Sequence, residues 1–175
     1  MNHQAHKEHE DSSWTSWASW FIGKKPAHTA FRAGILIVAA YIAFGVILLP
    51  VRMEGISMLP TYSGGINFAN RYSYEWSAPE RGDAVAVRMA GASVVFVKRI
   101  VGLPGERVGI DVGVVMINGE PLVERHVLYK TLWNMPEVAL GPNEYFLIGD
   151  NRGMPMKNHE FGKTTRDRIL GKMIF

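Results

Sequence analysis

Residues 82–119, "GDAVAVRMAGASVVFVKRIVGLPGERVGIDVGVVMING", decide the fold. Four short runs in this stretch are rich in valine and isoleucine, at 82–89, 93–101, 106–110 and 113–117. Turn signals separate them or follow the last, at Ala90-Gly91, Pro104-Gly105 and Asn118-Gly119. Such runs are typical of β-strands, and the connections between them are too short to hold helical crossovers. The stretch therefore predicts an antiparallel sheet or barrel.

The same pattern continues towards the C-terminus. Two more runs, at 144–149 and 168–175, predict strands, and Gly141-Pro142-Asn143 marks the turn before the first of them. Between the two groups of strands, Tyr129–Leu140 is expected to form a small cap or a short helix. Residues 52–175 are thus predicted to be one mainly β domain.

An uncharged apolar run of 19 residues, Ala33–Val51, precedes this domain, with Arg32 and Arg52 at its two ends. As a helix it would be about 28 Å long, which is close to the thickness of the hydrocarbon core of a membrane. A cleaved signal peptide is the alternative, but the run is too long for its apolar region and no small-x-small site follows. The sequence therefore predicts a single permanent transmembrane helix.

The charges beside this run predict its orientation. Lys24, Lys25 and Arg32 precede it without a neighbouring acid, whereas Arg52 is followed at once by Glu54. The positive-inside rule then places residues 1–32 in the cytoplasm and the β domain outside.

The N-terminal tail carries two periodic features. Tryptophans recur at every third residue, Trp14, Trp17 and Trp20. They predict either a short interfacial helix or an irregular tail whose indoles enter the lipid headgroups. The histidines His3, His6 and His9 have the same spacing, and a solvated tail explains them better than a metal site does.

Composition excludes several classes of function. The net charge is only +3, which gives no electrostatic reason to expect a nucleic-acid partner. The chain has no cysteine, so disulfides, cysteine nucleophiles and cysteine metal sites are excluded.

Ser57, in the stretch "EGISMLPTY" at 54–62, is a candidate nucleophile close to the apolar run. The G-x-S-x-G elbow of α/β-hydrolases is absent. The histidines of the β domain, His126 and His159, are more typical of surface or structural positions than of a base. Lys98 is the other candidate, because burial on a strand would lower its pKa enough to accept the serine proton. From the pattern alone, a solvated strand lysine, or one paired with an acid, explains Lys98 better than a base does.

Five blocks occur together in this chain and carry a resemblance. They are "GISMLPT" at 55–61, "RGDAVAV" at 81–87, "FVKRIVGLPGE" at 96–106, "INGE" at 117–120 and "YFLIGDNRG" at 145–153. Their order, after an apolar anchor, resembles that of type I signal peptidases, which are membrane-anchored serine proteases with a Ser–Lys dyad. Soluble self-cleaving repressors share the dyad, but the apolar span counts against them.

The resemblance implies a role for each matching residue. Ser57 would be the nucleophile, with its backbone N–H helping to hold the oxyanion, and Lys98 would be the general base. Gly55 stands where many members carry a hydroxyl as a second oxyanion donor. Shallow pockets for small substrate side chains would involve Met53, Phe96 and Val97. Arg99 and Asp150 would form a structural ion pair.

One block departs from the family's pattern, which commonly continues G-D-N-R-x-x-S-x-D-S-R. This chain has "GDNRGMPMKNHEFG" at 149–162, so that Pro155 replaces the serine that supports the base lysine. Lys157 replaces the aspartate and His159 the arginine. Proline has no hydroxyl and no N–H, so the orientation of Lys98 must come from another group. Lys157 is expected to add a positive charge near Lys98, which would favour its neutral form.

The resemblance implies an endopeptidase that removes signal peptides after small residues from exported pre-proteins. Its partners would be these pre-proteins and membrane lipid, and no metal or other cofactor would be required. We expect a single-pass protein of the plasma (inner) membrane with an extracytoplasmic β domain. Two alternatives remain: a relative that matures one dedicated substrate, and an impaired homologue that binds signal sequences without cleaving them.

Overall fold

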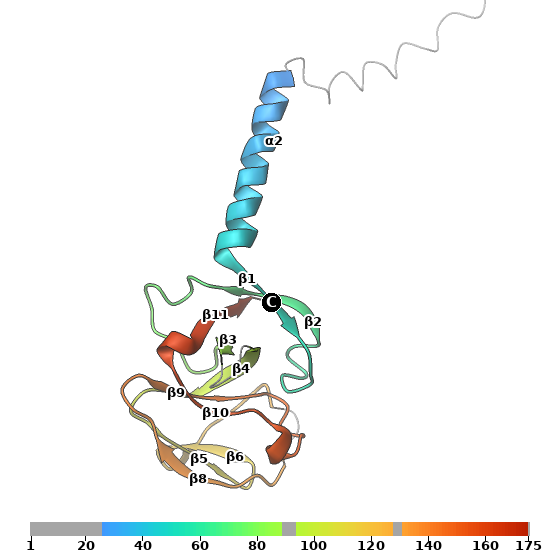
Figure 1. The fold of residues 1–175 in the computed structure, drawn as a ribbon. Helices are drawn as coiled ribbons and strands as arrows, with labels where there is room; N and C mark the ends of the chain where they lie inside the picture. Colours follow the sequence, from blue (N-terminus) through green and yellow to red (C-terminus); the bar gives the residue numbers. More distant parts are fainter. Residues whose placement is uncertain (1–25, 89–93, 128–130, 175) are drawn as a thin grey trace, which may run out of the picture. The chain divides into compact units, whose positions relative to one another are not determined.

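The computed structural model describes residues 26–88, 94–127 and 131–174 (Figure 1). The tail tryptophans and histidines, the two lysines before the span and the turn predicted at Ala90-Gly91 lie outside these ranges. The chain divides into two units, Met1–Ala43 and Phe44–Phe175. We describe each by itself.

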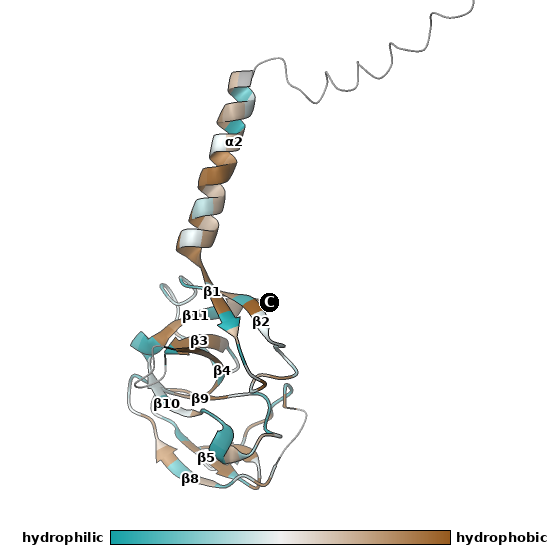
Figure 2. Cartoon of the chain, turned by 45° about the vertical axis from the view of Figure 1, so that its right-hand side comes forward, coloured by the Kyte–Doolittle hydropathy of each residue, from teal (hydrophilic) through white to brown (hydrophobic). Residues whose placement is uncertain are grey.

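A single apolar helix precedes the β-structure. It comprises α2 (Pro26–Tyr41) and a π-helical continuation, η1 (Ile42–Ile47), and it is apolar along most of its length (Figure 2). The 21 residues Ala27–Ile47 are long and apolar enough to cross a membrane, and none of the apolar window is buried within the protein.

The helix begins and ends earlier than the predicted span, Ala33–Val51. Leu48 to Val51 belong to strand β1 (Leu48–Met53), which pairs antiparallel with β2 (Gly65–Asn70). Pro50 explains the early end, because proline has no N–H for a helical hydrogen bond and its ring clashes with the preceding turn. The sequence interpretation was therefore wrong about the last four residues of the span.

The β-structure consists of two antiparallel sheets. The larger has the spatial order β1, β2, β11 (Ile169–Ile174), β3 (Ala84–Arg88), β4 (Val95–Gly102), β9 (Glu144–Ile148) and β10 (Gly162–Thr165). The smaller has the order β7 (Glu120–Pro121), β6 (Val114–Ile117), β5 (Arg107–Asp111) and β8 (Met135–Ala139). Two 3₁₀ turns, η2 (Met156–Asn158) and η3 (Arg166–Arg168), flank β10. The mainly β, antiparallel fold class predicted from the sequence is confirmed.

All six predicted strands are present, with boundaries shifted by a few residues. The short helix expected within Tyr129–Leu140 is wrong, because β8 occupies Met135–Ala139. β8 pairs with β5, and Arg107 donates a hydrogen bond from Nε to Glu137 Oε2 at 2.8 Å across the pair. Pro136 is compatible with a strand here because β8 is at the edge of its sheet.

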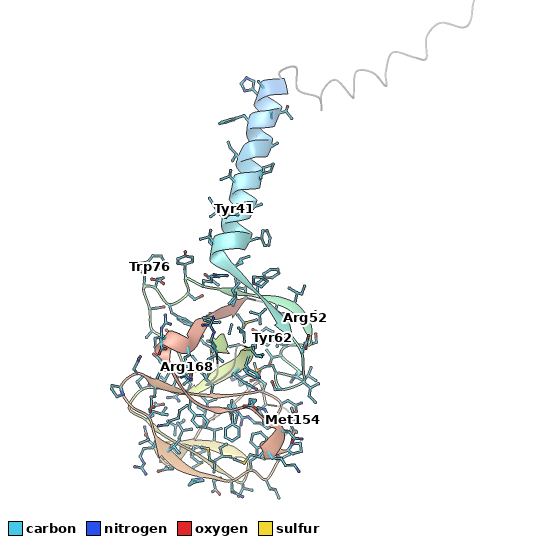
Figure 3. The ribbon with its side chains drawn as sticks, viewed as in Figure 1. Tyr41, Arg52, Tyr62, Trp76, Met154 and Arg168 are labelled. Carbon is cyan, nitrogen blue, oxygen red and sulfur yellow. The ribbon has the colours of Figure 1, made fainter. Side chains whose placement is uncertain are left out.

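Three apolar clusters form the core. The first contains Val51, Met58, Tyr62, Ala69, Ala84, Ala86, Val97 and Met173. The second joins the two sheets and contains Val101, Val108, Ile110, Val115, Trp133, Leu140, Phe146 and Ile148. The third contains Tyr74, Val85, Val87, Ile100, Tyr145, Leu147 and Ile169. Figure 3 shows side chains filling the space between the strands, with Tyr62 inside and Trp76, which is 90% exposed, at the periphery.

Truncating Leu147 to alanine should destabilise the β domain. Leu147 is fully buried in the third cluster, and such truncations lower the free energy of unfolding by about 2–5 kcal/mol. Denaturant unfolding of the full chain in detergent measures the effect. Val123→Ala is the control, because Val123 is 85% exposed and should shift the unfolding free energy by no more than about 0.5 kcal/mol. Equal midpoints for the two variants would contradict the described core.

Candidate active site

Ser57 lies in a tight turn that follows strand β1. Met58, next to it, is almost fully buried in the first cluster and anchors the turn from inside. Two backbone hydrogen bonds close the turn, from Leu59 N–H to the Ile56 carbonyl at 3.2 Å and from Tyr62 N–H to the Met58 carbonyl at 2.9 Å. The Ser57 residue is therefore held half-buried at the wall of the domain.

Asn151 fastens this turn to the end of strand β9. Its backbone N–H donates to the Ser57 carbonyl at 3.0 Å, and its side-chain Nδ2 donates to the Ile56 carbonyl at 3.0 Å. One residue thereby fixes two successive peptide units beside the candidate nucleophile. This contact was not anticipated from the sequence.

Gly149 allows the turn to approach so closely. A Cβ atom built on Gly149 would lie 2.3 Å from the Ser57 carbonyl oxygen and 2.6 Å from Cε1 of His159. Neither distance is sterically possible, so a residue with a side chain cannot occupy this position without moving both neighbours. The Ser57 carbonyl and the His159 ring consequently face the same Cα of Gly149.

Lys98 lies in β4, opposite Val85 of β3 in the antiparallel register. Only 1% of the residue is exposed, and its Nζ lies 3.1 Å from Ser57 Oγ. The structure therefore brings together the two residues predicted to form the dyad, at hydrogen-bond distance. Lys98 Nζ also lies 5.9 Å from the centroid of the Phe96 ring.

Burial lowers the pKa of Lys98 from 10.5 to about 8, and the Glu160 carboxylate opposes this by favouring the ammonium. The sequence predicted that a positive charge at Lys157 would help to lower the pKa of Lys98. Lys157 is not the cause, because its side chain is exposed and the charge that acts on Lys98 is the carboxylate of Glu160, which raises the pKa. About a tenth of Lys98 is thus neutral at pH 7, and a neutral amine can accept a proton.

Two buried ion pairs stand next to the dyad. Arg99 binds Asp150 through two hydrogen bonds, Nε to Oδ1 at 2.7 Å and Nη2 to Oδ2 at 2.6 Å, and the Thr61 hydroxyl also donates to Asp150. The ion pair expected at Arg99 and Asp150 is therefore present. It links the residue after Lys98 to the residue after Gly149.

The second ion pair was not anticipated from the sequence. Arg152 donates to both carboxylate oxygens of Glu124, and its Nε donates to the Gly149 carbonyl at 2.9 Å. Both side chains are buried. This pair ties the loop after β7 to Gly149, the residue that contacts Ser57.

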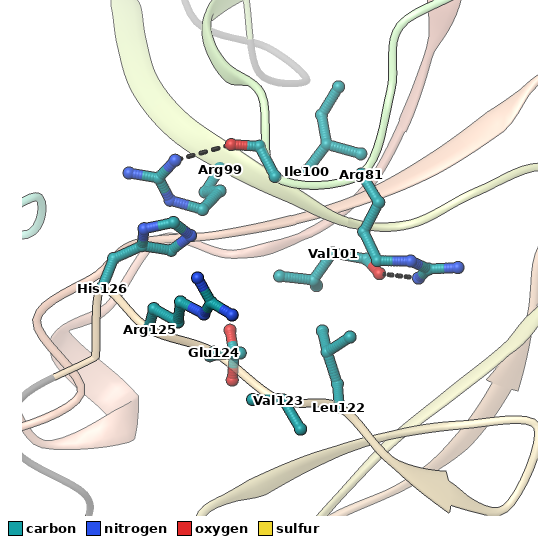
Figure 4. Close-up of a pocket in the computed structure, with 10 residues that line it drawn as sticks. Arg81, Arg99, Ile100, Val101, Leu122, Val123, Glu124, Arg125 and His126 are labelled. Atoms are coloured by element: carbon teal, nitrogen blue, oxygen red, sulfur yellow. Dashed lines mark hydrogen bonds between the residues drawn. The ribbon is translucent and has the colours of Figure 1, made fainter.

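A cavity of about 280 Å³ lies beside Arg99 and not beside the dyad (Figure 4). Its polar lining includes the side chains of Arg81, Arg99, Glu124, Arg125 and His126. His126, one of the two histidines considered as a base, is exposed at this cavity. Ser57 and Lys98 are not among the residues that line it.

The three residues predicted to bind substrate fall into two groups. Met53 and Val97 both pack in the first cluster, next to Met58 of the Ser57 turn. Phe96 packs against the third cluster. Met53 and Val97 therefore share one apolar cluster with Met58 of the Ser57 turn, whereas Phe96 lies on the side of Lys98.

The chain is similar to known proteins. The family model described as "Signal peptidase, peptidase S26" matches residues 27–175. The chain belongs to the signal peptidase family. The match includes the apolar helix and every residue of the site described above.

Named relatives within the signal peptidase family agree with this assignment. A "Probable signal peptidase I-1" of Synechocystis sp. is 30% identical over 128 residues, covering 68% of this chain and 65% of the relative. A "Signal peptidase I" of Leptolyngbya laminosa is 32% identical over 127 residues, covering 67% and 63%. A "Signal peptidase I" of Bacillus caldolyticus is 30% identical over 138 residues, covering 70% and 75%. The chain thus spans less than two thirds of the length of the first two relatives.

Among solved structures, a signal peptidase I from Enterococcus faecalis V583 aligns with a TM-score of 0.46 and 23% identity. The alignment covers 56% of this chain and 98% of that chain.

Replacing Lys98 by methionine should remove one pH-dependent component of stability. The folded-state pKa of about 8 lies below the ordinary value of 10.5, so between these pH values the unfolded chain binds the additional proton and stability rises with pH. The rise amounts to about 3 kcal/mol, on the order of 1.4 kcal/mol for each unit of pKa difference.

The test compares the unfolding free energy of the wild type and Lys98→Met from pH 7 to 10. The difference between them should move in favour of the wild type as pH rises, because other groups titrate equally in both proteins. A difference that stays constant would mean that the Lys98 amine is not desolvated.

Gly149→Ala should disrupt the site more than the fold. The new methyl group would displace the Ser57 carbonyl and the His159 ring, and overpacking of this kind lowers the free energy of unfolding by about 1–3 kcal/mol. Gly141→Ala is the matched control, because its Cβ would make only ordinary contacts, the nearest at 3.4 Å to Glu144. Reactivity of Ser57 towards a serine-directed fluorophosphonate should fall at least about tenfold in Gly149→Ala alone.

Proposed function

We propose that this protein is a membrane-anchored serine endopeptidase that cleaves signal peptides from exported pre-proteins, with Ser57 as nucleophile and Lys98 as general base. The observation that carries the proposal is the 3.1 Å separation of Lys98 Nζ and Ser57 Oγ with the lysine withdrawn from water. A buried amine with a lowered pKa is the feature that lets lysine replace histidine as the base.

The reaction follows from these two groups. Neutral Lys98 accepts the Ser57 hydroxyl proton as Oγ attacks the scissile carbonyl. The resulting ammonium donates a proton to the departing amine, and an acyl-enzyme remains on Ser57. Lys98 then takes a proton from an attacking water molecule, which releases the new carboxylate and restores the Ser57 hydroxyl.

The Ser57 backbone N–H is the proposed oxyanion donor. Among residues 26–88, 94–127 and 131–174, it donates no hydrogen bond, although the Ser57 carbonyl accepts one from Asn151. Gly55, which is exposed and has φ of 123°, provides no side-chain donor. We therefore assign the stabilisation of the negative charge that develops on the substrate oxygen to this backbone N–H.

Two strand edges support binding of the substrate in an extended form. The first is β1, which lies at the edge of the larger sheet. The second is the start of β4: Val95–Val97 pairs with β3 on one side, and β9 pairs with the other side of β4 only from Arg99 onwards. Both edges lead to the dyad, and a peptide strand can hydrogen-bond to such edges. Met53 and Val97 would then accept the small side chains before the scissile bond.

The apolar helix supports a location at a membrane. Ala27–Ile47 would anchor the protein, and the cationic residues before it favour a cytoplasmic N-terminus and an extracytoplasmic β domain. Ser57 follows the end of this helix by only ten positions in the sequence. The substrate bond, which follows the apolar region of a signal sequence, would lie at the same membrane surface.

Cleavage of a pre-protein with an Ala-x-Ala site by the full chain in detergent tests the proposal. Ser57→Ala and Lys98→Ala should each lower kcat/KM by at least about 10³, because either change removes the dyad. Ser63→Ala and Lys157→Ala are matched controls at exposed positions and should keep wild-type rates. Wild-type kcat/KM should fall about tenfold for each pH unit below about 8, where Lys98 becomes protonated.

Undiminished cleavage by either dyad variant would refute the mechanism. Binding of the pre-protein without any cleavage by the wild type would instead favour a signal-sequence binding protein.

A further inference from the structure

As a base, Lys98 needs hydrogen-bond acceptors for its own N–H groups as well as the Ser57 hydroxyl as proton donor. A neutral amine has one lone pair and two N–H groups, and the lone pair must point at the Ser57 hydroxyl if Lys98 is to act as a base. Within the part of the chain that the structure describes, Ser57 Oγ is the one hydrogen-bond partner of Nζ. Because buried polar groups are almost always paired, the two N–H groups require acceptors.

Position 155 does not provide such an acceptor. Pro155 has no hydroxyl, and it is exposed at the start of the 3₁₀ turn Met156–Asn158, whereas Lys98 is buried. Glu160 acts on Lys98 electrostatically, but its side chain is exposed to water. The acceptor for the Lys98 N–H groups is therefore expected to be another group that is both polar and buried.

His159 meets these conditions. Only 6% of the residue is exposed, and its ring packs edge-on against Trp133 with the ring centroids 5.0 Å apart. On its other side the ring lies against Gly149, which also contacts the Ser57 carbonyl. The imidazole and the Ser57 carbonyl thus lie against the same Cα, that of Gly149, while the Lys98 amine contacts the Ser57 hydroxyl.

The imidazole has free hydrogen-bonding capacity. Neither Nδ1 nor Nε2 completes a hydrogen bond with any group in the described part of the chain, although both are buried. The pKa of His159 is lowered to about 4, mainly by burial and also by the positive charges of Lys98 and Arg152, while the backbone of Glu160 and Asn151 opposes the change. At neutral pH the ring is therefore uncharged and offers one acceptor nitrogen.

We propose that His159 is a positioning residue for Lys98: its buried ring nitrogen accepts a hydrogen bond from one water molecule that in turn accepts an N–H of the amine, and this bridge turns the lone pair towards Ser57 Oγ. The inference rests on the proposed function for its effect on cleavage. It assigns to His159 the orienting role that a hydroxyl at position 155 would otherwise fill. It also predicts that the water-mediated contact is present in the protein without substrate.

The decisive comparison is between His159→Phe and His159→Gln. Phenylalanine keeps the aromatic packing on Trp133 but has no acceptor, so kcat should fall about tenfold with KM unchanged. The acid limb of the pH profile should also move down by about half a unit, because the ammonium loses an acceptor that stabilised it. Glutamine restores an acceptor and should recover most of kcat and the position of the limb.

Trp133→Phe is the matched control for packing. It loosens the same aromatic group and leaves the imidazole in place, so it should lower the free energy of unfolding without moving the acid limb. If His159→Phe keeps the wild-type kcat and pH profile, the inference is wrong. It is equally wrong if the phenylalanine and glutamine variants lose activity to the same extent.

A second readout separates this inference from the proposed function. The Lys98 pKa can be followed by NMR of protein labelled with ¹⁵N at lysine Nζ, in the absence of any substrate. A lower pKa in His159→Phe than in the wild type and His159→Gln would support the positioning contact even if no pre-protein is cleaved. Cleavage by the wild type together with three equal Lys98 pKa values would overturn the inference and leave the proposed function intact.

Discussion

Lys98 is buried at the centre of the larger sheet, and the desolvation of its ammonium is the constraint on which the site depends. Withdrawing the charge from water lowers the pKa to about 8, whereas a nearby carboxylate, Glu160, raises it again. The pairing of β3 with β4 provides this environment, because it places Lys98 opposite Val85, a fully buried residue. The reactivity of the amine is thus a property of the sheet and not of the lysine side chain alone.

The two buried guanidinium groups near the dyad are compatible with this arrangement because both are neutralised. Asp150 holds Arg99 and Glu124 holds Arg152, each through two hydrogen bonds. Breaking such a pair would leave a buried charge without compensation, which is strongly destabilising. Each pair also fixes main chain at the site, since Arg99 donates to the Gly82 carbonyl and Arg152 to the Gly149 carbonyl. Their contribution is therefore geometric as much as electrostatic.

The sequence predicted those features that depend on local pattern. Strands rich in valine, such as 93–101, were found because their composition is distinctive, whereas β8 was missed because Pro136 and Glu137 do not resemble a strand. Ser57 and Lys98 were identified through their motifs, since a lysine on a strand is by itself better explained as a solvated or acid-paired side chain. Non-local contacts outside the family motifs could not be predicted: the burial of His159 depends on Trp133 and Gly149, and neither contact leaves a local signal.

The presence of a histidine beside a reactive serine raises the question of which group is the base. The pKa of His159 is lowered to about 4 and that of Lys98 to about 8, so a proton released by Ser57 is held far more strongly by the amine. The positive charge that forms on Lys98 is itself one of the causes of the low pKa of the imidazole. The ring therefore remains a neutral acceptor throughout the reaction, and it can orient the lysine without competing with it for the proton.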